Sequence, residues 1–309
     1  MRSLPAFPRV QAIPAVGRAS LHLDGIERAG YEFAPADTRP YIFPLIGPSG
    51  RCLTRIGHPD PIGHEHHKSV WFGHQSVAGI NFWEDRPSSD IRIRHRCVRL
   101  YHDGEQWGGL VADLDWWAQG RSILQHELIV AIEPTHGGGF ALDIQSRLES
   151  SSGAPVELGK TNFGFLGVRV AKTMSEQFGG GRLLNARGFL GEAALLGEPS
   201  AWIDYSGPIA PARTEGICFM DHPTNPGHPV RWHARADGWM GASFNREAGY
   251  GIARDHPLHL RYRLLVHPGK PSHKELDTEW ETFAATPPYA IIPPHRGNLA
   301  GLERNSISI

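Results

Sequence analysis

The sequence predicts an all-β protein, built as a large antiparallel double-sheet β-sandwich. The chain has 309 residues, of which 36 are glycine and 25 are proline, and both residue types are unfavourable inside helices. Apolar residues recur at the period of two that half-buried strands show, and helical periodicity is almost absent. About a dozen short strands separated by turn residues favour a sandwich over a helical bundle.

The clearest strand lies at 91–101, where Ile91 and Ile93 alternate with arginines, so that apolar and basic side chains point to opposite faces. Three further segments continue this alternation: 108–117, 122–133 and 139–149. Glycine-rich turns, such as the one at 137–139, separate these segments. Four successive strands joined by short turns predict an antiparallel meander.

The later part of the chain holds further strand candidates, which are 163–171, 215–220, 229–235 and 258–266. Residues 191–196 predict at most one or two helical turns. No change in composition marks an internal boundary, so we expect one sandwich domain over 1–284. The proline-rich segment 285–309 is expected to form a tail that packs on this domain.

Charge and composition argue against several classes of protein. Lys and Arg total 31 while Asp and Glu total 32, so no overall positive field attracts nucleic acid or an anionic membrane. No apolar run reaches 18 residues, and the N-terminus lacks the apolar core of a secretory signal. The three cysteines lie far apart and indicate free thiols. We therefore expect a cytoplasmic protein that takes a small-molecule substrate and has no nucleic-acid or membrane partner.

Histidine is unusually common, with 18 residues, and five fall within 17 positions: His58, His64, His66, His67 and His74. In an extended chain, His64 and His66 point to one side while Glu65 and His67 point to the other. His64 and His66, with His74 or another histidine as third ligand, match the donor set of a divalent metal. The same imidazoles also suit acid–base catalysis near neutral pH. A polar loop that satisfies buried backbone groups is the structural alternative.

A second polar cluster occupies 221–235, directly after the apolar strand that ends at Met220. Asp221 and His222 are therefore expected at a strand end, and three prolines between 223 and 229 stiffen the loop that follows. Asn225, His233 and Arg235 add hydrogen-bonding groups to this cluster. The alternative is a simple turn in which the Asp221 side chain bonds nearby backbone.

Aromatic residues accompany both clusters, among them Trp71, Trp83, Trp232 and Trp239. An aromatic face covers the C–H groups of a sugar while planar polar side chains bind its hydroxyls, so Asn81 and Trp83 are expected to contact one. Glu127 lies inside the apolar run 122–133, where an unpaired charge is costly. It is expected either to pair with a cation or to serve in catalysis.

Four parts of the sequence together resemble a known family: 39–46 (RPYIFPLI), 64–74 with 81–83, 202–207 (WIDYSG) and 221–229 (DHPTNPGHP). They are similar to the soluble family labelled "methane oxygenase PmoA", over about 39–268. Methane oxygenase subunits are embedded in membranes and this chain has no such span, so the label does not imply methane oxidation. The resemblance implies a supersandwich fold like that of galactose mutarotases and related carbohydrate enzymes. In mutarotase-like sites a histidine protonates the sugar ring oxygen while a carboxylate takes the anomeric proton.

The resulting hypothesis is a carbohydrate-active enzyme of epimerase, lyase or hydrolase type that uses histidine and carboxylate acid–base chemistry. The expected catalytic residues are His67, His74, Asp221, His222 and Glu127. The expected substrate-binding residues are His64, Asn81, Trp83, Asn225, His233 and Arg235. Two alternatives stay open: a metal-dependent enzyme whose ligands are His64 and His66 with His74 or His222, and a non-catalytic carbohydrate-binding module. We expect both polar clusters to meet on one concave sheet face.

Overall fold

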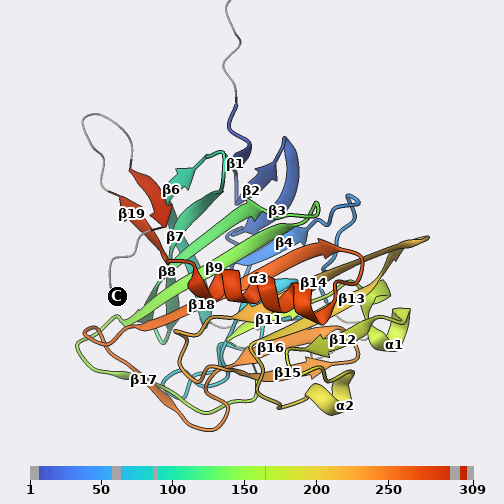
Figure 1. The fold of residues 1–309 in the computed structure, drawn as a ribbon. Helices are drawn as coiled ribbons and strands as arrows, with labels where there is room; N and C mark the ends of the chain where they lie inside the picture. Colours follow the sequence, from blue (N-terminus) through green and yellow to red (C-terminus); the bar gives the residue numbers. More distant parts are fainter. Residues whose placement is uncertain (1–6, 58–63, 86–89, 164, 293–299, 305–309) are drawn as a thin grey trace, which may run out of the picture.

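The computed structural model describes residues 7–57, 64–85, 90–163, 165–292 and 300–304. Within these ranges the chain forms two large antiparallel sheets of eight strands each, packed face to face (Figure 1). This arrangement confirms the predicted all-β sandwich. No helix among the described residues is long and apolar enough to span a membrane.

The first sheet has the strand order β1-β2-β3-β4-β5-β11-β16-β15. Its strands are β1 (Val10–Ala15), β2 (Arg18–Leu23), β3 (Ile26–Glu32), β4 (Tyr41–Leu45), β5 (Val70–Phe72), β11 (Leu166–Arg169), β16 (Trp239–Ser243) and β15 (Arg231–Arg235). Strands from the first quarter of the chain thus meet strands from residues 166–243 where β5 pairs with β11.

The second sheet has the order β12-β13-β14-β18-β9-β8-β7-β6. Its strands are β12 (Arg182–Asn185), β13 (Trp202–Ala210), β14 (Arg213–Asp221), β18 (Leu258–Pro268), β9 (Phe140–Ser150), β8 (Arg121–Pro134), β7 (Gly108–Ala118) and β6 (Arg92–His102). The consecutive pairing of β6, β7, β8 and β9 confirms the predicted meander.

Smaller elements complete the described structure. They are the strand pair β10 (Val156–Leu158) and β17 (Tyr250–Ile252), the strand pair β19 (Tyr289–Ile292) and β20 (Gly301–Arg304), the 3-10 helix η1 (Lys172–Met174), and the helices α1 (Glu176–Gly179), α2 (Glu192–Leu195) and α3 (His273–Ala285). The helical turn expected at 191–196 corresponds to α2.

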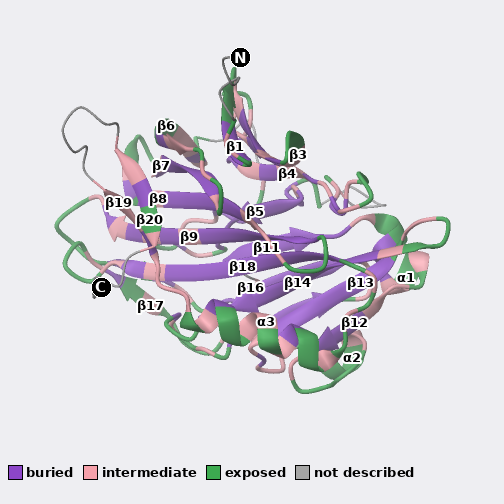
Figure 2. Cartoon of the chain, turned by 45° about the horizontal axis from the view of Figure 1, so that its top comes forward, coloured by how far each residue is buried: buried purple, intermediate pink, exposed green. Residues whose placement is uncertain are grey.

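The core lies between the two sheets because side chains alternate along each strand. In β7, Leu110, Ala112 and Leu114 are buried in the main apolar cluster, whereas Asp113 points to the outer face. Figure 2 shows the same division, with strands mostly buried and the connecting loops exposed. One continuous core therefore joins the sheets into a sandwich.

Helix α3 covers part of the outer face of the second sheet (Figure 1). Its N-terminus is a capping box, in which the Ser272 hydroxyl accepts from the Glu275 N–H and the Glu275 carboxylate accepts from the Ser272 N–H. Leu276 and Phe283 pack against Trp202 and neighbouring apolar residues. This helix was not predicted from the sequence, although the Ser-x-x-Glu spacing at 272–275 is a helix-start signal.

The strand pair β19 and β20 packs on another part of the same outer face. Tyr289 and Leu302 contact Leu100, Val111 and Ile129 in a small apolar cluster. The segment 285–309 was expected to form a tail. Its first residue, Ala285, is the last residue of α3, and its other described residues include the paired strands β19 and β20.

Candidate active site

The outer face of the first sheet, opposite the core, carries aromatic and polar side chains. Along β5, Val70 and Phe72 belong to the core, so Trp71 points to the outer face. Along β16, Met240 belongs to the core, and Trp239 joins Trp71 in a separate aromatic cluster. The period-two pattern thus creates a second, smaller aromatic layer outside the sandwich core.

Strand register aligns the outward residues of β5, β11, β16 and β15 in two neighbouring rows. The first row consists of Trp71, Gly167, Gly241 and His233. The second row consists of Arg169, Trp239 and Arg235. These residues come from distant parts of the sequence, and only sheet pairing makes them one surface.

A pocket of about 600 Å³ lies over this surface, a size that suits a small-molecule ligand. Its walls include the segments 64–67, before β5, and 81–85, after β5. The described residues that line it are His64, Glu65, His66, His67, Gln75, Asn81, Trp83, Glu84, Asp85, Phe163, Arg169, His233, Arg235, Asp237 and Trp239.

His66 and His67 are both nearly buried in the pocket wall, with 7% of each residue exposed. Their rings are perpendicular, and the ring centroids lie 4.5 Å apart. His66 packs against Trp83 at 5.3 Å, and His67 stacks on Trp239 at 5.2 Å with 16° between the planes. Burial lowers the pKa of His66 to about 4, so its imidazole is neutral at pH 7.

Three further rings form a stack beside these histidines. Phe163 lies between Trp83, at 5.2 Å, and His233, at 5.4 Å, with 19° between the planes in each case. His233 Nδ1 lies 2.8 Å from the Asn162 carbonyl oxygen and donates to it, which leaves Nε2 of the neutral ring as an acceptor. Burial lowers the pKa of His233 and so favours this neutral form.

The two arginines among the described lining residues are engaged with carboxylates. Arg169 is fully buried, and its two amino groups donate to the two oxygens of Asp237 at 2.8 and 3.1 Å. Arg235 Nε lies 2.7 Å from Glu192 Oε1. Bidentate pairing of this kind fixes a side chain in one orientation, so Arg169 and Asp237 form a rigid part of the wall.

Carboxylates also reach the pocket from the segment after β5. Asn81 orders this segment, because its Oδ1 accepts from the Glu84 N–H at 3.3 Å and its Nδ2 donates to Glu84 Oε1 at 3.0 Å. Asp85 accepts from the Thr38 hydroxyl at 2.5 Å and lies 3.3 Å from Lys68 Nζ. The pocket therefore combines imidazoles with carboxylates, the two kinds of group most used in acid–base catalysis.

The structure brings one part of the sequence-predicted site together in this pocket. These residues are His64, His66, His67, Asn81, Trp83, His233 and Arg235. His58 of the histidine cluster lies outside the described residues. The second polar cluster contributes only its β15 portion, because β15 pairs with β16 in the first sheet while residues 213–221 form β14 of the second.

His74, expected to be catalytic, is fully buried and is not among the residues that line the pocket. Its Nδ1 accepts from the Ser76 N–H at 3.1 Å, so the neutral ring carries its proton on Nε2, which lies 3.4 Å from Asn245 Oδ1. Burial lowers its pKa to about 4. Both ring nitrogens thus bond within the protein, which is the arrangement of a structural histidine.

Asp221 is also fully buried and lies apart from the pocket-lining residues. Its carboxylate accepts from Asn225 Nδ2 at 2.7 Å, His228 Nδ1 at 2.7 Å and the Val230 N–H at 3.0 Å. Burial raises its pKa, and these bonds act in the opposite direction. The Asn225 amide also bonds both the Arg261 N–H and the Arg261 carbonyl, so Asp221 and Asn225 order the loop at 222–230.

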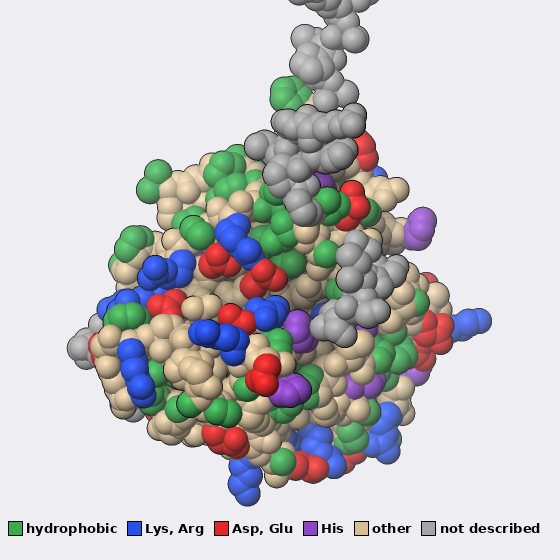
Figure 3. All heavy atoms as spheres, turned by 90° about the vertical axis from the view of Figure 1, so that its left-hand side faces the viewer, with side chains coloured by type: hydrophobic (Ala, Val, Ile, Leu, Met, Phe, Trp, Pro, Cys, Tyr) green, Lys and Arg blue, Asp and Glu red, His purple; other side chains and the backbone are tan. Residues whose placement is uncertain are grey.

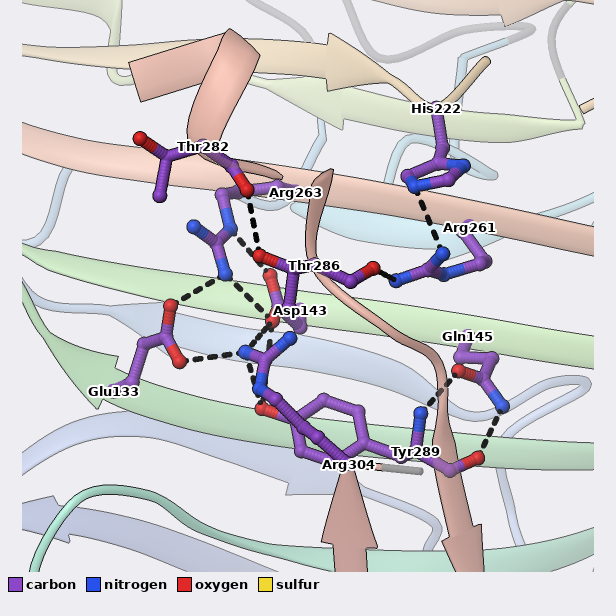
Figure 4. A network of polar contacts seen from close by, with 10 residues as sticks. All are labelled: Glu133, Asp143, Gln145, His222, Arg261, Arg263, Thr282, Thr286, Tyr289 and Arg304. Atoms are coloured by element: carbon purple, nitrogen blue, oxygen red, sulfur yellow. Dashed lines mark hydrogen bonds and ion pairs between the residues drawn. The ribbon is translucent and has the colours of Figure 1, made fainter. Parts of the chain in front are cut away.

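His222 lies beside α3 rather than in the pocket. Figure 4 shows its ring pointing toward Arg261, whose amino group donates to His222 Nε2 at 2.8 Å. Its Nδ1 lies 2.8 Å from the Thr224 hydroxyl, and its ring packs edge-on against Phe283 at 5.0 Å. Burial, together with the Arg261 charge, lowers the pKa of His222 to about 3.

Glu127 lies on the outer face of the second sheet, where it forms an ion pair with Arg99. Arg99 also contacts Asp113 at 3.0 Å, and Arg147 contacts Glu149 at 2.7 Å on the neighbouring strand. Figure 3, which looks at the side where β6, β8 and β17 lie in Figure 1, shows basic and acidic side chains interspersed. Of the two expectations for Glu127, pairing with a cation is the one observed.

The expected metal-ligand set is not assembled in the described structure. His64 and His66 share the pocket with 6.2 Å between their ring centroids, whereas His74 and His222 form the bonds given above. Among residues that the structure describes, no group of three His, Cys, Asp or Glu side chains is arranged to hold a metal ion.

Several pocket residues were not found from the sequence. They are Gln75, Glu84, Asp85, Phe163, Arg169 and Asp237. Arg169 carried a usable signal, since it alternates with Leu166 and Val168 at the period of two that separates the faces of a strand. Asp237 carried none, because its partner on β11 is almost 70 residues away.

Comparisons with known proteins identify a family but no activity. A family model matches residues 18–281, and its description is a family of unknown function, DUF6807. No curated protein sequence matches the chain. Similar solved structures include a 4-alpha-glucanotransferase from Thermococcus litoralis (11% identity, TM-score 0.31) and a heparinase III (11% identity, TM-score 0.32). The matches cover 85% and 89% of this chain but only 40% and 31% of the two enzymes.

Proposed function

The chain belongs to this family of unknown function, and from its own pocket we propose that it is a carbohydrate-active enzyme that uses histidine and carboxylate acid–base chemistry. The observation that supports the proposal is the meeting of His67, Glu84 and Asp85 beside Trp83 in one pocket of about 600 Å³. Such a mixture of aromatic surface and hydrogen-bonding groups fits a sugar or sugar derivative.

In this proposal His67 gives a proton to a sugar oxygen, and a carboxylate, Glu84 or Asp85, removes a proton from the sugar. Asp221 and Glu127 were expected to be catalytic but lie outside this pocket. Glu84 and Asp85 replace them in the proposal because both line the pocket on the same segment as Trp83, whereas the pocket carboxylate Asp237 is paired with Arg169. His64, Asn81, His233 and Arg235 are proposed to bind hydroxyl groups. Epimerase, lyase and hydrolase reactions all use such a pair of groups.

Structural roles are proposed for the remaining candidates. His74, Asp221, His222 and Asn225 order loops through the bonds described above, and Glu127 stabilises an outer sheet face.

The test is an NMR screen of the purified protein against free monosaccharides, amino sugars, uronic acids and disaccharides. Saturation transfer reports binding, and changes in sugar proton signals in heavy water report turnover. His67→Asn is expected to slow turnover by about 10²–10⁴-fold, the usual contribution of a general acid or base. His259→Asn is the matched control, because His259 is half-buried on β18 and does not line the pocket.

Each outcome of the screen has a distinct meaning. Turnover that falls in His67→Asn and persists in His259→Asn supports the proposal. Binding of a sugar without turnover by the wild-type protein indicates a carbohydrate-binding module and overturns the enzymatic part. Absence of any sugar binding overturns the proposal as a whole.

A further inference from the structure

We propose that Trp239 is a positioning residue for His67, and that Gly167 and Gly241 leave the space in which the Trp239 ring lies flat against the sheet. The catalytic meaning of this inference rests on the proposed function, in which His67 transfers a proton. The geometry itself depends only on the contacts among β5, β11 and β16.

The Trp239 ring occupies the space that a side chain at 167 would need. A Cβ atom added to Gly167 would lie 2.1 Å from Cη2 and 2.6 Å from Cζ3 of Trp239. A Cβ atom added to Gly241 would lie 2.9 Å from Cζ2 of the same ring. Neither glycine has a positive φ angle, so space and not backbone conformation is what favours glycine at both positions.

Two further indole rings pack against the Trp239 ring. Trp71 packs against it at 4.8 Å, and Trp83 meets it at 5.6 Å with 85° between the planes. Only 4% of Trp239 is exposed. A large aromatic ring so enclosed has one available orientation, and it can therefore serve as a fixed surface.

His67 lies on this fixed surface. The His67 ring is within 16° of parallel to the Trp239 ring. The rings of His64 and His66 contact the His67 ring edge-on, at 77° and 89°. Rotation of the His67 imidazole would break the stacked contact and bring its edge into the Trp239 face. Together with Trp71, which lies 5.2 Å from His67, Trp239 thus fixes the plane of the His67 ring, and with it the plane in which the ring nitrogens lie.

The consequence is specific for catalysis. A group that positions the proton donor acts on the chemical step, whereas a group that only contacts the sugar acts on binding. Loss of Trp239 is therefore expected to lower kcat by about 10–100-fold, as displacement of a catalytic group by about 1 Å does, while KM changes little. Gly167→Ala should have the same effect without replacing any side chain that lines the pocket, because it displaces the same Trp239 ring.

The experiment measures the His67 ring protons by NMR in wild type, Trp239→Leu, Trp239→Phe and Gly167→Ala. The His67 signals are assigned as those that disappear in His67→Asn. Stacking on an indole shifts these signals upfield. The shift is expected to be reduced in Trp239→Leu and Gly167→Ala, where only Trp71 remains packed on His67, and largely kept in Trp239→Phe, with kcat following the same order. Gly251→Ala is the control, because a Cβ atom there meets only Glu157 Oε2, at 4.0 Å.

The two proposals fail in different ways. Unchanged His67 signals in Trp239→Leu overturn the positioning role, whatever the enzyme does, and so does a kcat that stays at the wild-type value in that variant. If Gly167→Ala does not fold, the comparison of Trp239→Leu with Trp239→Phe decides the question. A wild-type protein that turns over no sugar overturns the proposed function and, with it, the catalytic role of the stacked pair.

Discussion

Arg263 and Asp143 form a bidentate ion pair on the outer face of the second sheet (Figure 4). Arg263 Nε donates to Asp143 Oδ1 at 2.7 Å and Nη2 donates to Oδ2 at 2.9 Å, with 2% and 6% of the two side chains exposed. Arg304 of β20 donates to the same carboxylate at 2.8 Å. Asp143 therefore ties the C-terminal strand pair to the sandwich, and Glu133 bonds both arginines from the other side.

Removal of this carboxylate is expected to destabilise the protein strongly. Asp143→Ala leaves Arg263 and Arg304 with Glu133 as their remaining carboxylate partner, and breaking a buried pair in this way costs about 3–5 kcal/mol. Urea denaturation measures the free energy of unfolding. Glu247→Ala, which removes an exposed partner of Arg231, is the control and should cost only a small fraction of this. Equal losses in the two variants would contradict the prediction.

Stability is expected to fall as the pH drops from about 7 toward 4. Burial lowers the pKa of His74 to about 4 and of His126 to about 3, whereas histidine in an unfolded chain has a pKa of about 6.5. Between these values the unfolded chain binds protons that the folded chain does not. Each such histidine therefore removes about 1.4 kcal/mol of stability per pH unit in this range.

Urea titrations at stepped pH values measure this slope. His126→Gln is expected to reduce it by the share of one histidine, because that variant has one proton fewer to take up on unfolding. A free energy of unfolding that stays constant between pH 7 and 5 would show that these buried imidazoles do not resist protonation.

Asp237→Asn is expected to lower the free energy of unfolding by about 2–3 kcal/mol. The variant keeps the shape of the side chain but leaves the buried Arg169 guanidinium without its charged acceptor. The 25% exposure of Asp237 places the loss below that of a fully buried pair. Thermal unfolding measures the change, with Asp255→Asn on the exposed loop after β17 as control. Equal melting temperatures for the two variants would rule out a structural role for the Arg169 pair.

Asp221→Asn and His222→Gln are expected to lower the melting temperature but to leave sugar affinity unchanged in the folded protein. Asp221 accepts three hydrogen bonds, and His222 bonds Arg261 and Thr224, so both substitutions weaken the loop at 222–230. Calorimetric titration with a sugar found in the screen measures the affinity. A large loss of affinity or turnover at unchanged melting temperature would contradict the structural role and indicate that Asp221 and His222 act in the active site.

Strand prediction was most successful where the chain pairs with its immediate neighbour. The segments 91–101, 108–117, 122–133 and 139–149 match β6 to β9 within a few residues. The strands β1 to β4 were missed, although they pair in order along the chain. Part of the reason is local, because bulges between β2 and β3 and between β3 and β4 interrupt the period-two pattern.

Site prediction was limited because strand pairing is not visible in the local sequence. A tight group of polar residues in the sequence marks a loop, but it does not say which side of a strand each residue faces or which sheet the strand joins. Asp221 ends β14 in the second sheet, and His233 lies in β15 of the first, so one sequence cluster contributes to two places.

The sequence alone determined the class of this protein and the alternation that separates inside from outside, because glycine, proline and period-two patterns act through local conformation. It also identified the histidines at 64–67 and the aromatic residues beside them. Only the tertiary structure decided that the Trp239 ring lies over Gly167 and stacks with His67, and that Arg169 pairs with Asp237. These contacts join strands that are far apart in the chain, and sheet register, a long-range property, is what brings them together.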